Sequence, residues 1–241
     1  MPLVRTGLAL CALLVLGLAR MALPLRAIER LGWGMVLLLF RVRLTVHGQP
    51  AQGGVLMLAN HVSWIDIVAL GRVSDACFVA KSEVGTWPVI GPAARRMGCL
   101  FVDRGSRRSA QVIAAQIGAR LTAGRNVIVF PEGTTGPGDG VLSFRSTLTG
   151  ATTIRALTIQ PVTLVYRGVN DRTLAAWLGD ASLLPHALAL ARSGGIGLEI
   201  WFEKPFVAPD RKAAAIGAEA AVAARLLREL DGQAATLKRV A

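Results

Sequence analysis

Short apolar runs alternate with longer stretches of helical periodicity along most of this chain. The apolar runs predict strands at 41–47, 55–59, 77–80, 99–102, 126–130, 157–165 and 197–202. The stretches between them predict helices near 64–70, 88–97, 109–123, 147–154, 175–190 and 212–230. This alternation predicts an α/β fold, in which helices cover both faces of the sheet.

Two further apolar runs, residues 7–19 and 31–40, precede the first strand. Both are shorter than the roughly twenty residues that cross a bilayer. Residues 1–43 also hold six arginines and one acid, Glu29, and arginine stems can reach the headgroups while apolar side chains sink below them. We therefore expect a membrane anchor of two apolar helices at 1–43 and a globular domain at 44–241. A single tilted span and a cleaved signal peptide are the alternatives, although Arg20 stands where cleavage needs a small residue.

The composition favours an anionic membrane surface over nucleic acid as a partner. Lysine and arginine total 27 against 15 acidic residues, a formal charge of +12, and 53% of residues are hydrophobic. No zinc cluster, helix-turn-helix pattern or aromatic-rich basic face is visible, so we expect no nucleic-acid partner. The three cysteines, Cys11, Cys77 and Cys99, are scattered in apolar contexts and predict buried free thiols in a reducing compartment.

The segment around His61 carries the first candidate chemistry. An imidazole can remove a hydroxyl proton near neutral pH, and a carboxylate on its other nitrogen fixes the tautomer. On one regular helix His61 and Asp66 would point about 140° apart. Ser63, however, is a good N-cap for a helix that begins near Trp64. We therefore expect His61 in a turn, with Asp66 reaching back to it from the first helical turn.

Three later segments accompany this pair. Asp103-Arg104 ends one predicted strand and Glu132-Gly133-Thr134 follows the next, while Gln160-Pro161-Val162 interrupts a third with a proline, which belongs at an edge, an end or a bulge. In order and spacing, the four segments resemble the signature blocks of the glycerophospholipid and lysophospholipid acyltransferase family, over about residues 50–205. The resemblance implies a mixed sheet of the glycerolphosphate-acyltransferase type.

The resemblance also implies a reaction. His61, oriented by Asp66, would take a proton from the hydroxyl of a lysolipid drawn from the bilayer, and the oxygen would attack an acyl thioester directly. Acyl carrier protein or acyl-CoA would be the donor, and no bound cofactor or metal is expected. Backbone N–H groups near Pro161 and Val162, or at the start of the following helix, could stabilise the oxyanion. The expected location is the cytoplasmic face of a bacterial inner membrane.

Several residues would hold the acceptor if the resemblance extends to them. Arg104 could grip a phosphate or carboxylate, and Glu132 a hydroxyl or amide. Gly133 permits close backbone approach. The remaining candidates are Lys81, whose position resembles that of a headgroup-contacting lysine in relatives, together with Thr134, Thr135 and Arg145.

Thr135 departs from the pattern of phosphatidate-forming relatives, which usually carry arginine or lysine there. Together with Phe144-Arg145-Ser146-Thr147-Leu148, it makes the chain most similar to the bacterial branch that acylates lyso-ornithine lipid, whose headgroup has no phosphate. Arg145 could neutralise the carboxylate of that headgroup. A 1-acyl-sn-glycerol-3-phosphate acyltransferase is the alternative, because Lys81, Arg104 and Arg145 could hold a phosphate.

Two other classes of protein compete less well. A non-catalytic lipid-binding protein would not need His61, Asp66, Glu132 and Gly133 together. An ester hydrolase would need a Gly-x-Ser-x-Gly segment or a denser set of metal ligands, and the histidines at 47, 61 and 186 are scattered.

Overall fold

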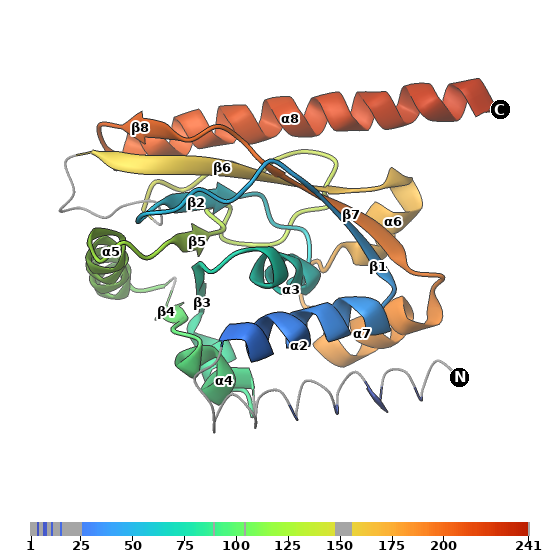
Figure 1. Ribbon diagram of the computed structural model, residues 1–241, viewed down its shortest axis with the longest axis horizontal. Helices are drawn as coiled ribbons and strands as arrows, with labels where there is room; N and C mark the ends of the chain where they lie inside the picture. The colour runs from blue at the N-terminus through green and yellow to red at the C-terminus, as the bar shows by residue number, and fades with distance from the viewer. Residues whose placement is uncertain are drawn as a thin grey trace.

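A mixed eight-stranded sheet forms the centre of the computed structural model (Figure 1). The structure describes residues 26–88, 90–103, 105–147 and 156–240, together with Val4, Gly7, Leu8, Cys11 and Val15. The strands are β1 (Val42–His47), β2 (Leu56–Ala59), β3 (Cys77–Lys81), β4 (Leu100–Val102), β5 (Val127–Val129), β6 (Leu157–Tyr166), β7 (Ile196–Phe202) and β8 (Phe206–Ala208). All seven predicted strands are confirmed within two residues at each end, and β8 was not predicted.

The strand order is β1-β7-β6-β2-β5-β3-β4, and β8 pairs with β6 beside β7. Strands β6, β2, β5, β3 and β4 run parallel to one another, whereas β7 and β8 are antiparallel to β6. The carboxyl ends of β2, β5, β3 and β4 therefore meet at one edge of the sheet. In sheets of this kind ligands bind outside that edge, and His61, Glu132 and Lys81 all lie at it.

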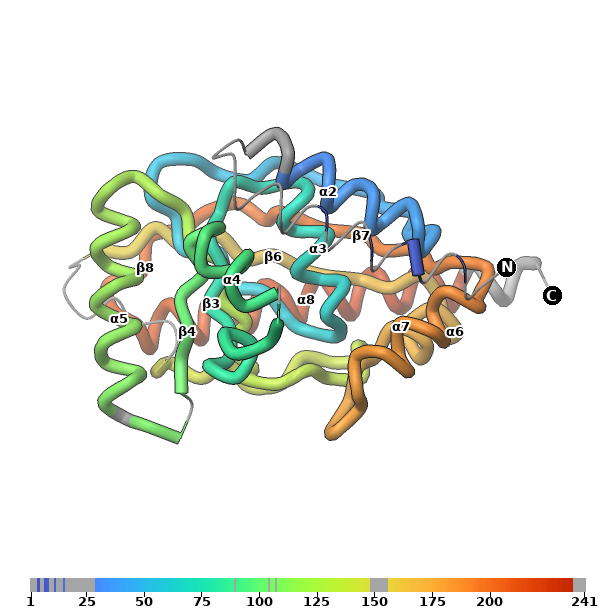
Figure 2. The backbone as a smooth tube through the Cα atoms, turned by 90° about the horizontal axis from the view of Figure 1, so that it is seen from below, coloured from blue at the N-terminus to red at the C-terminus, as the bar shows by residue number. Residues whose placement is uncertain are grey.

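Helices cover both faces of the sheet, as predicted. They are α2 (Arg26–Leu39), α3 (Trp64–Val73), the short 3-10 helix η1 (Ser82–Thr86), α4 (Ile90–Arg96), α5 (Arg107–Thr122), α6 (Gly168–Ala175), α7 (Leu183–Arg192) and α8 (Arg211–Val240). Helices α2, α3 and α7 share one core with the sheet, and α5 and α8 share the other. Figure 2 looks onto the face covered by α2 and α3.

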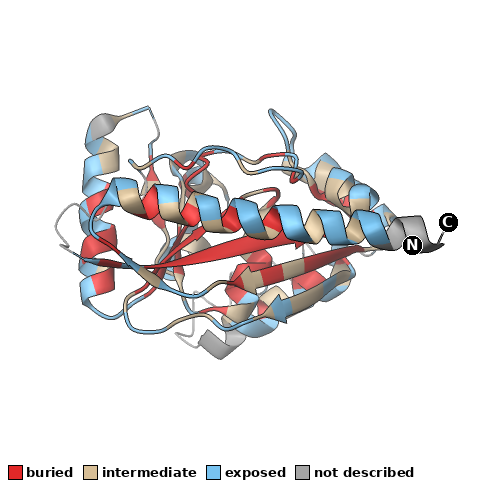
Figure 3. Ribbon diagram, turned by 90° about the horizontal axis from the view of Figure 1, so that it is seen from above, coloured by how far each residue is buried: buried red, intermediate tan, exposed pale blue. Residues whose placement is uncertain are grey.

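The two cores follow from the pleat of the strands. In β2, Met57 and Ala59 point into the first core, and Leu56 and Leu58 into the second. Against the second core α8 places a stripe of mostly small residues, which Figure 3 shows as the buried side of the helix. Small side chains let the helix axis approach the sheet closely. The stripe consists of Ala214, Ala215, Ala218, Val222 and Leu226.

Residues 31–40, the second apolar run of the expected anchor, lie mostly in an amphipathic helix. Helix α2 packs against α3, and Val36 and Leu37 belong to the first core. The opposite side of α2 exposes Leu31, Met35 and Leu38. No helix in the described part of the chain is long and apolar enough to cross a bilayer. Most of run 7–19 lies outside the described residues, and the anchor at 1–43 stays a prediction.

The helix predicted at 175–190 is wrong as a single element, because α6 ends at Ala175 and α7 begins at Leu183. Pro185 explains the break. Proline has no N–H, so it would interrupt a continuous helix. The first turn of α7 tolerates proline, because N–H groups in the first turn of a helix have no partner within it. Gly179 lies in the connection with a φ of +57°. The helix predicted at 147–154 falls almost wholly outside the described residues.

Pro161 lies in the interior of the sheet rather than on an edge strand. One side of β6 pairs with β2, where Pro161 faces Leu58. On the other side the partner of β6 changes, from β8 at Ile159 to β7 at Val162. Pro161 occupies the gap between these two ladders, so its missing N–H interrupts neither of them there.

Candidate active site

The loop that carries His61 is fixed to the sheet by its first residue. The buried side chain of Asn60 donates to the carbonyl of Leu164 (3.0 Å) and accepts from the N–H of the same residue (2.8 Å). This two-point contact ties the end of β2 to β6. His61 therefore leaves the sheet at the carboxyl edge in a defined direction.

The structure brings His61 and Asp66 together in the arrangement expected from the sequence. His61 Nδ1 lies 2.8 Å from Asp66 Oδ2, and the same oxygen accepts the N–H groups of Val62 (2.7 Å) and Ser63 (2.8 Å). Ser63 is the N-cap of α3, and Asp66 is the third helical residue. The sequence therefore places Asp66 where its carboxylate can both cap the helix and hold the imidazole.

The other carboxylate oxygen of Asp66 has a partner that sequence reasoning missed. The hydroxyl of Tyr166, at the end of β6, donates to Asp66 Oδ1 over 2.6 Å. Both residues are buried. Burial, with the charge of Asp66, raises the pKa of Tyr166 well above its ordinary value, so the phenol keeps its proton. Asp66 thus accepts four hydrogen bonds, which compensate for burying its charge.

The imidazole of His61 has one open side. It stacks on Phe130, with ring centroids 4.0 Å apart and an interplanar angle of 17°. Because Asp66 accepts at Nδ1, that nitrogen carries the proton and Nε2 presents a lone pair. No hydrogen bond is found for Nε2 among the described residues, and 12% of the side chain is exposed. A hydroxyl that reaches Nε2 can transfer its proton there.

Glu132 lies beside this pair at the end of β5. Its side chain is 3% exposed, and burial raises its pKa to about 8, against the opposing effect of the N–H groups of Leu142 and His61. Its Oε1 has no hydrogen-bond partner among the described residues. A protonated carboxyl in this position can donate as well as accept a hydrogen bond.

The residues after Glu132 form a loop against the His61 segment. Gly133 has a φ of +75°, a conformation that favours glycine. A side chain at Gly133 would lie about 3.7 Å from the guanidinium carbon of Arg145, so Arg145 covers this glycine. The N–H of Gly136 donates to the carbonyl of His61 over 2.7 Å. Arg145 is therefore close to the loop that borders the base.

Thr135 is tied to a third loop. Its hydroxyl donates to the carbonyl of Trp177, in the connection between α6 and α7, and the N–H of Trp177 donates to the carbonyl of Val62 (2.9 Å). Trp177 thus links the loops that carry Thr135 and His61. Thr134 is exposed in the same loop.

The other candidates stand apart from this cluster. Lys81 ends β3 at the same edge of the sheet but forms an exposed ion pair with Glu83, at 2.8 Å. Arg104 lies outside the described residues. Val162 is paired with Ala59 on one side and Phe202 on the other, which does not favour the oxyanion role expected for its N–H.

Cys77 and Cys99 offer no competing chemistry. Burial raises the pKa of Cys77, and raises that of Cys99 to about 12, so neither thiol is reactive near neutral pH. The expectation of burial is wrong for Cys11, which is exposed.

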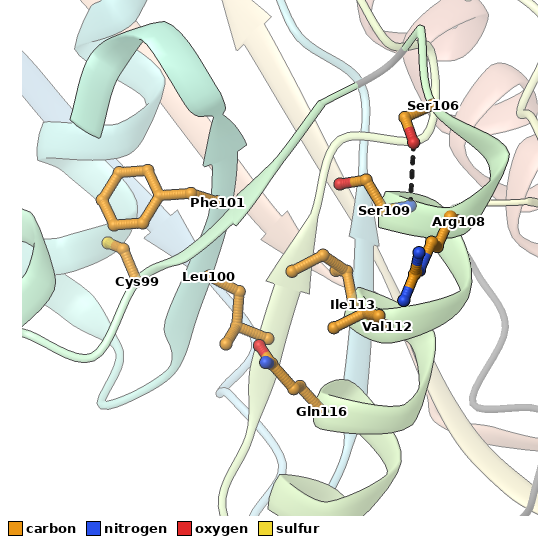
Figure 4. Close-up of a pocket in the computed structure, with 9 residues that line it drawn as sticks. All are labelled: Cys99, Leu100, Phe101, Ser106, Arg108, Ser109, Val112, Ile113 and Gln116. Carbon is orange, nitrogen blue, oxygen red and sulfur yellow. Dashed lines mark hydrogen bonds between the residues drawn. The ribbon is translucent and has the colours of Figure 1, made fainter. Parts of the chain in front are cut away.

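A hollow of about 530 Å³ lies between β4 and α5, away from these residues (Figure 4). Leu100 of β4 and Val112, Ile113 and Gln116 of α5 line it, and the Ser106 cap of α5 forms its upper end. Strand β4 is the third strand from β2, so the hollow is roughly 14 Å from the strand that precedes His61. Among the described residues, its lining includes no acid or histidine.

Comparisons with known proteins define the class to which this site belongs. The acyltransferase family model matches residues 43–165, and the chain belongs to this family of enzymes. A crystal structure of the 1-acyl-sn-glycerophosphate acyltransferase from Thermotoga maritima has the same fold, with a TM-score of 0.57, 17% identity, and coverage of 96% of this chain and 98% of that one.

Relatives that share more sequence include lyso-ornithine lipid O-acyltransferases and 1-acyl-sn-glycerol-3-phosphate acyltransferases. The lyso-ornithine lipid O-acyltransferase of Rhizobium meliloti is 36% identical, over 84% of this chain and 74% of that protein. The protein of the same name from Brucella abortus is 37% identical, over 81% and 80%. The 1-acyl-sn-glycerol-3-phosphate acyltransferase of Neisseria meningitidis is 42% identical, but over 51% of this chain and 49% of that protein.

Proposed function

We propose that this enzyme transfers a fatty acyl group from a thioester to the hydroxyl of lyso-ornithine lipid. The observation that carries the proposal is the contact between His61 and Asp66, which leaves Nε2 of the imidazole open at the carboxyl edge of the sheet. The names of the R. meliloti and B. abortus relatives, which match most of the chain, support this acceptor.

The reaction needs one base and no acyl-enzyme. His61 Nε2 takes the proton of the acceptor hydroxyl as its oxygen attacks the thioester carbonyl. The carbon–sulfur bond then breaks, and the imidazolium returns the proton to the departing thiolate, which gives an ester and a free thiol. Asp66 keeps the Nδ1 proton in place and stabilises the transient imidazolium, and Tyr166 holds Asp66.

The donor and the membrane belong to the same proposal. Acyl carrier protein or acyl-CoA supplies the thioester, and the acceptor comes from the cytoplasmic leaflet of a bacterial inner membrane. The apolar stripe of Leu31, Met35 and Leu38 on α2 supports contact with lipid, because these residues are exposed and share one side of the helix.

Phosphatidate synthesis is the second candidate. The Neisseria relative favours it, since that protein is 42% identical over 51% of this chain. Arg145 and Lys81 could contribute positive charge toward a phosphate. Against it, Thr135 offers a hydroxyl that is already bonded to Trp177, and a neutral residue forms no ion pair with phosphate.

Acceptor competition decides between the two candidates. Purified enzyme receives equal amounts of lyso-ornithine lipid and lysophosphatidate in mixed micelles, with one acyl donor at a time, and mass spectrometry measures both products. We expect acylated ornithine lipid to dominate. Predominant phosphatidate would make the second candidate correct, and product from neither acceptor would contradict both. Running the assay with each donor identifies the thioester that the enzyme uses.

A further inference from the structure

A groove of about 450 Å³ lies between the end of η1 and the connection from α6 to α7. Figure 2 shows this connection at the lower edge of the molecule, where the segment after β5 also lies. The groove differs from the hollow beside β4 in its lining, because its residues include two tryptophans and an aspartate. The lining residues are Trp87, Trp177, Gly179, Asp180, Ala181, Ser182 and Leu183.

The groove adjoins the candidate base through Trp177. The backbone of Trp177 donates to the carbonyl of Val62, the residue after His61, and accepts the hydroxyl of Thr135. Its indole N–H donates to the carbonyl of Ala181 over 2.6 Å, which fixes the ring. One wall of the groove is therefore held between the two loops that border His61.

The lining suits a cation. Indole faces attract ammonium groups, and the attraction adds to that of a nearby carboxylate. Asp180 is exposed, and no hydrogen bond or ion pair is found for it among the described residues. This acid lines the groove in a chain with a formal charge of +12. Arg145 lies on a different loop beside the same site, so the two loops offer opposite charges.

We propose that this groove binds the ammonium group of an amino-acid lipid acceptor, with Asp180 as its counter-ion and Trp87 and Trp177 as its aromatic walls. The assignment rests on the proposed function, because lyso-ornithine lipid carries both a free amine and a carboxylate. Arg145 is placed to meet the carboxylate. A phosphate headgroup has no cation for the groove and is repelled by Asp180, so the same residue discriminates against lysophosphatidate.

The test compares an acceptor that carries an ammonium group with one that does not. One is lyso-ornithine lipid, and the other is the same lipid with its free amine acetylated. We expect Asp180→Asn to raise KM for the first acceptor about fivefold, as for one solvent-exposed ionic contact, and to leave KM for the acetylated lipid unchanged. Asp180→Glu keeps the negative charge, so its KM for the charged acceptor should stay close to that of wild type. Asp231→Asn, an exposed change on α8, is the matched control and should alter neither value.

A second variant tests the aromatic wall. Trp87→Leu should also raise KM selectively for the charged acceptor, because leucine keeps an apolar surface but has no π face. Circular dichroism of each variant checks that the fold is retained. Asp180→Asn should in addition lower KM for lysophosphatidate, if that lipid is accepted at all.

The outcomes separate this inference from the proposed function. Equal KM changes for both ornithine acceptors, or none, in an enzyme that acylates lyso-ornithine lipid would overturn the ammonium site and leave the function standing. A Trp87→Leu effect that follows acyl-chain length instead of headgroup charge would assign the groove to the acyl chain. Wild-type enzyme that acylates only lysophosphatidate would contradict the proposed function, and the ammonium site with it.

Discussion

Replacing Glu132 by glutamine tests whether a protonated carboxyl is buried beside the base. Burial raises the pKa of Glu132 to about 8, from an ordinary value of 4.5. The folded protein therefore binds this proton at pH values at which the unfolded chain has already lost it. Its contribution to stability is complete below about pH 4.5 and is lost as the pH rises through about 8. Glutamine imitates the neutral form and cannot ionise.

The size of the effect follows from the difference between the two pKa values. The pKa of Glu132 differs by about 3.5 units between the folded and the unfolded chain, and each unit corresponds to about 1.36 kcal/mol. The free energy of unfolding can therefore change by about 5 kcal/mol. The side chain of Glu132 is 3% exposed, so solvent screens little of this energy. We expect the free energy of unfolding of wild type to fall by roughly 3–5 kcal/mol relative to Glu132→Gln between pH 5 and pH 9. The two proteins should differ least at pH 5.

Urea denaturation of both proteins at each pH measures this difference. Glu83→Gln is the matched control, because Glu83 is exposed and the hydrogen bond from Lys81 lowers its pKa, so it stays ionised throughout the range. Its unfolding curve should follow wild type at every pH. Parallel pH profiles for wild type and Glu132→Gln would refute the buried, protonated carboxyl.

Three further predictions concern other contacts. Tyr166→Phe removes one of the four donors to Asp66, so Asp66 holds the imidazole less firmly and the acyl-transfer rate should fall several-fold. Unchanged kinetics would contradict the positioning role. Thr135→Arg should raise the use of lysophosphatidate, whereas Thr135→Ser, which keeps the hydroxyl bonded to Trp177, should retain wild-type selectivity in the same acceptor assay. Deletion of residues 1–40 should lower membrane binding, and it should also lower the melting temperature because α2 supplies core side chains. An unchanged melting temperature would show that α2 is dispensable for the fold.

The contact between His61 and Asp66 was predictable because it is local. Ser63 signals the start of a helix, and that start alone places Asp66 within reach of a histidine five residues before it. The alternation of strands and helices is also local, and it predicted the α/β fold with helices on both faces of the sheet. Pro185 was a visible signal for two helices instead of one, but the apolar periodicity of residues 175–190 obscured it.

The rest of the site depends on contacts between distant parts of the chain. Tyr166 meets Asp66 across 100 residues, because β6 lies beside β2. Thr135 meets Trp177 across 42 residues, in a loop with no repeating pattern. The raised pKa of Glu132 results from burial, which the Glu-Gly-Thr segment does not reveal. These features follow from the packing of the sheet and its loops, so no single segment predicts them.

The acyl-transfer rate of purified His61→Ala tests the central claim most directly. His47→Ala is the matched control. His47 ends β1, which is three strands from β2 in the sheet, and its side chain pairs with Glu199. With lyso-ornithine lipid and a thioester donor, loss of a positioned base should lower the rate at least roughly 100-fold, with the fold retained. His47→Ala should remain within a few-fold of wild type. A His61→Ala rate within a few-fold of wild type would contradict the assignment of His61 as the base.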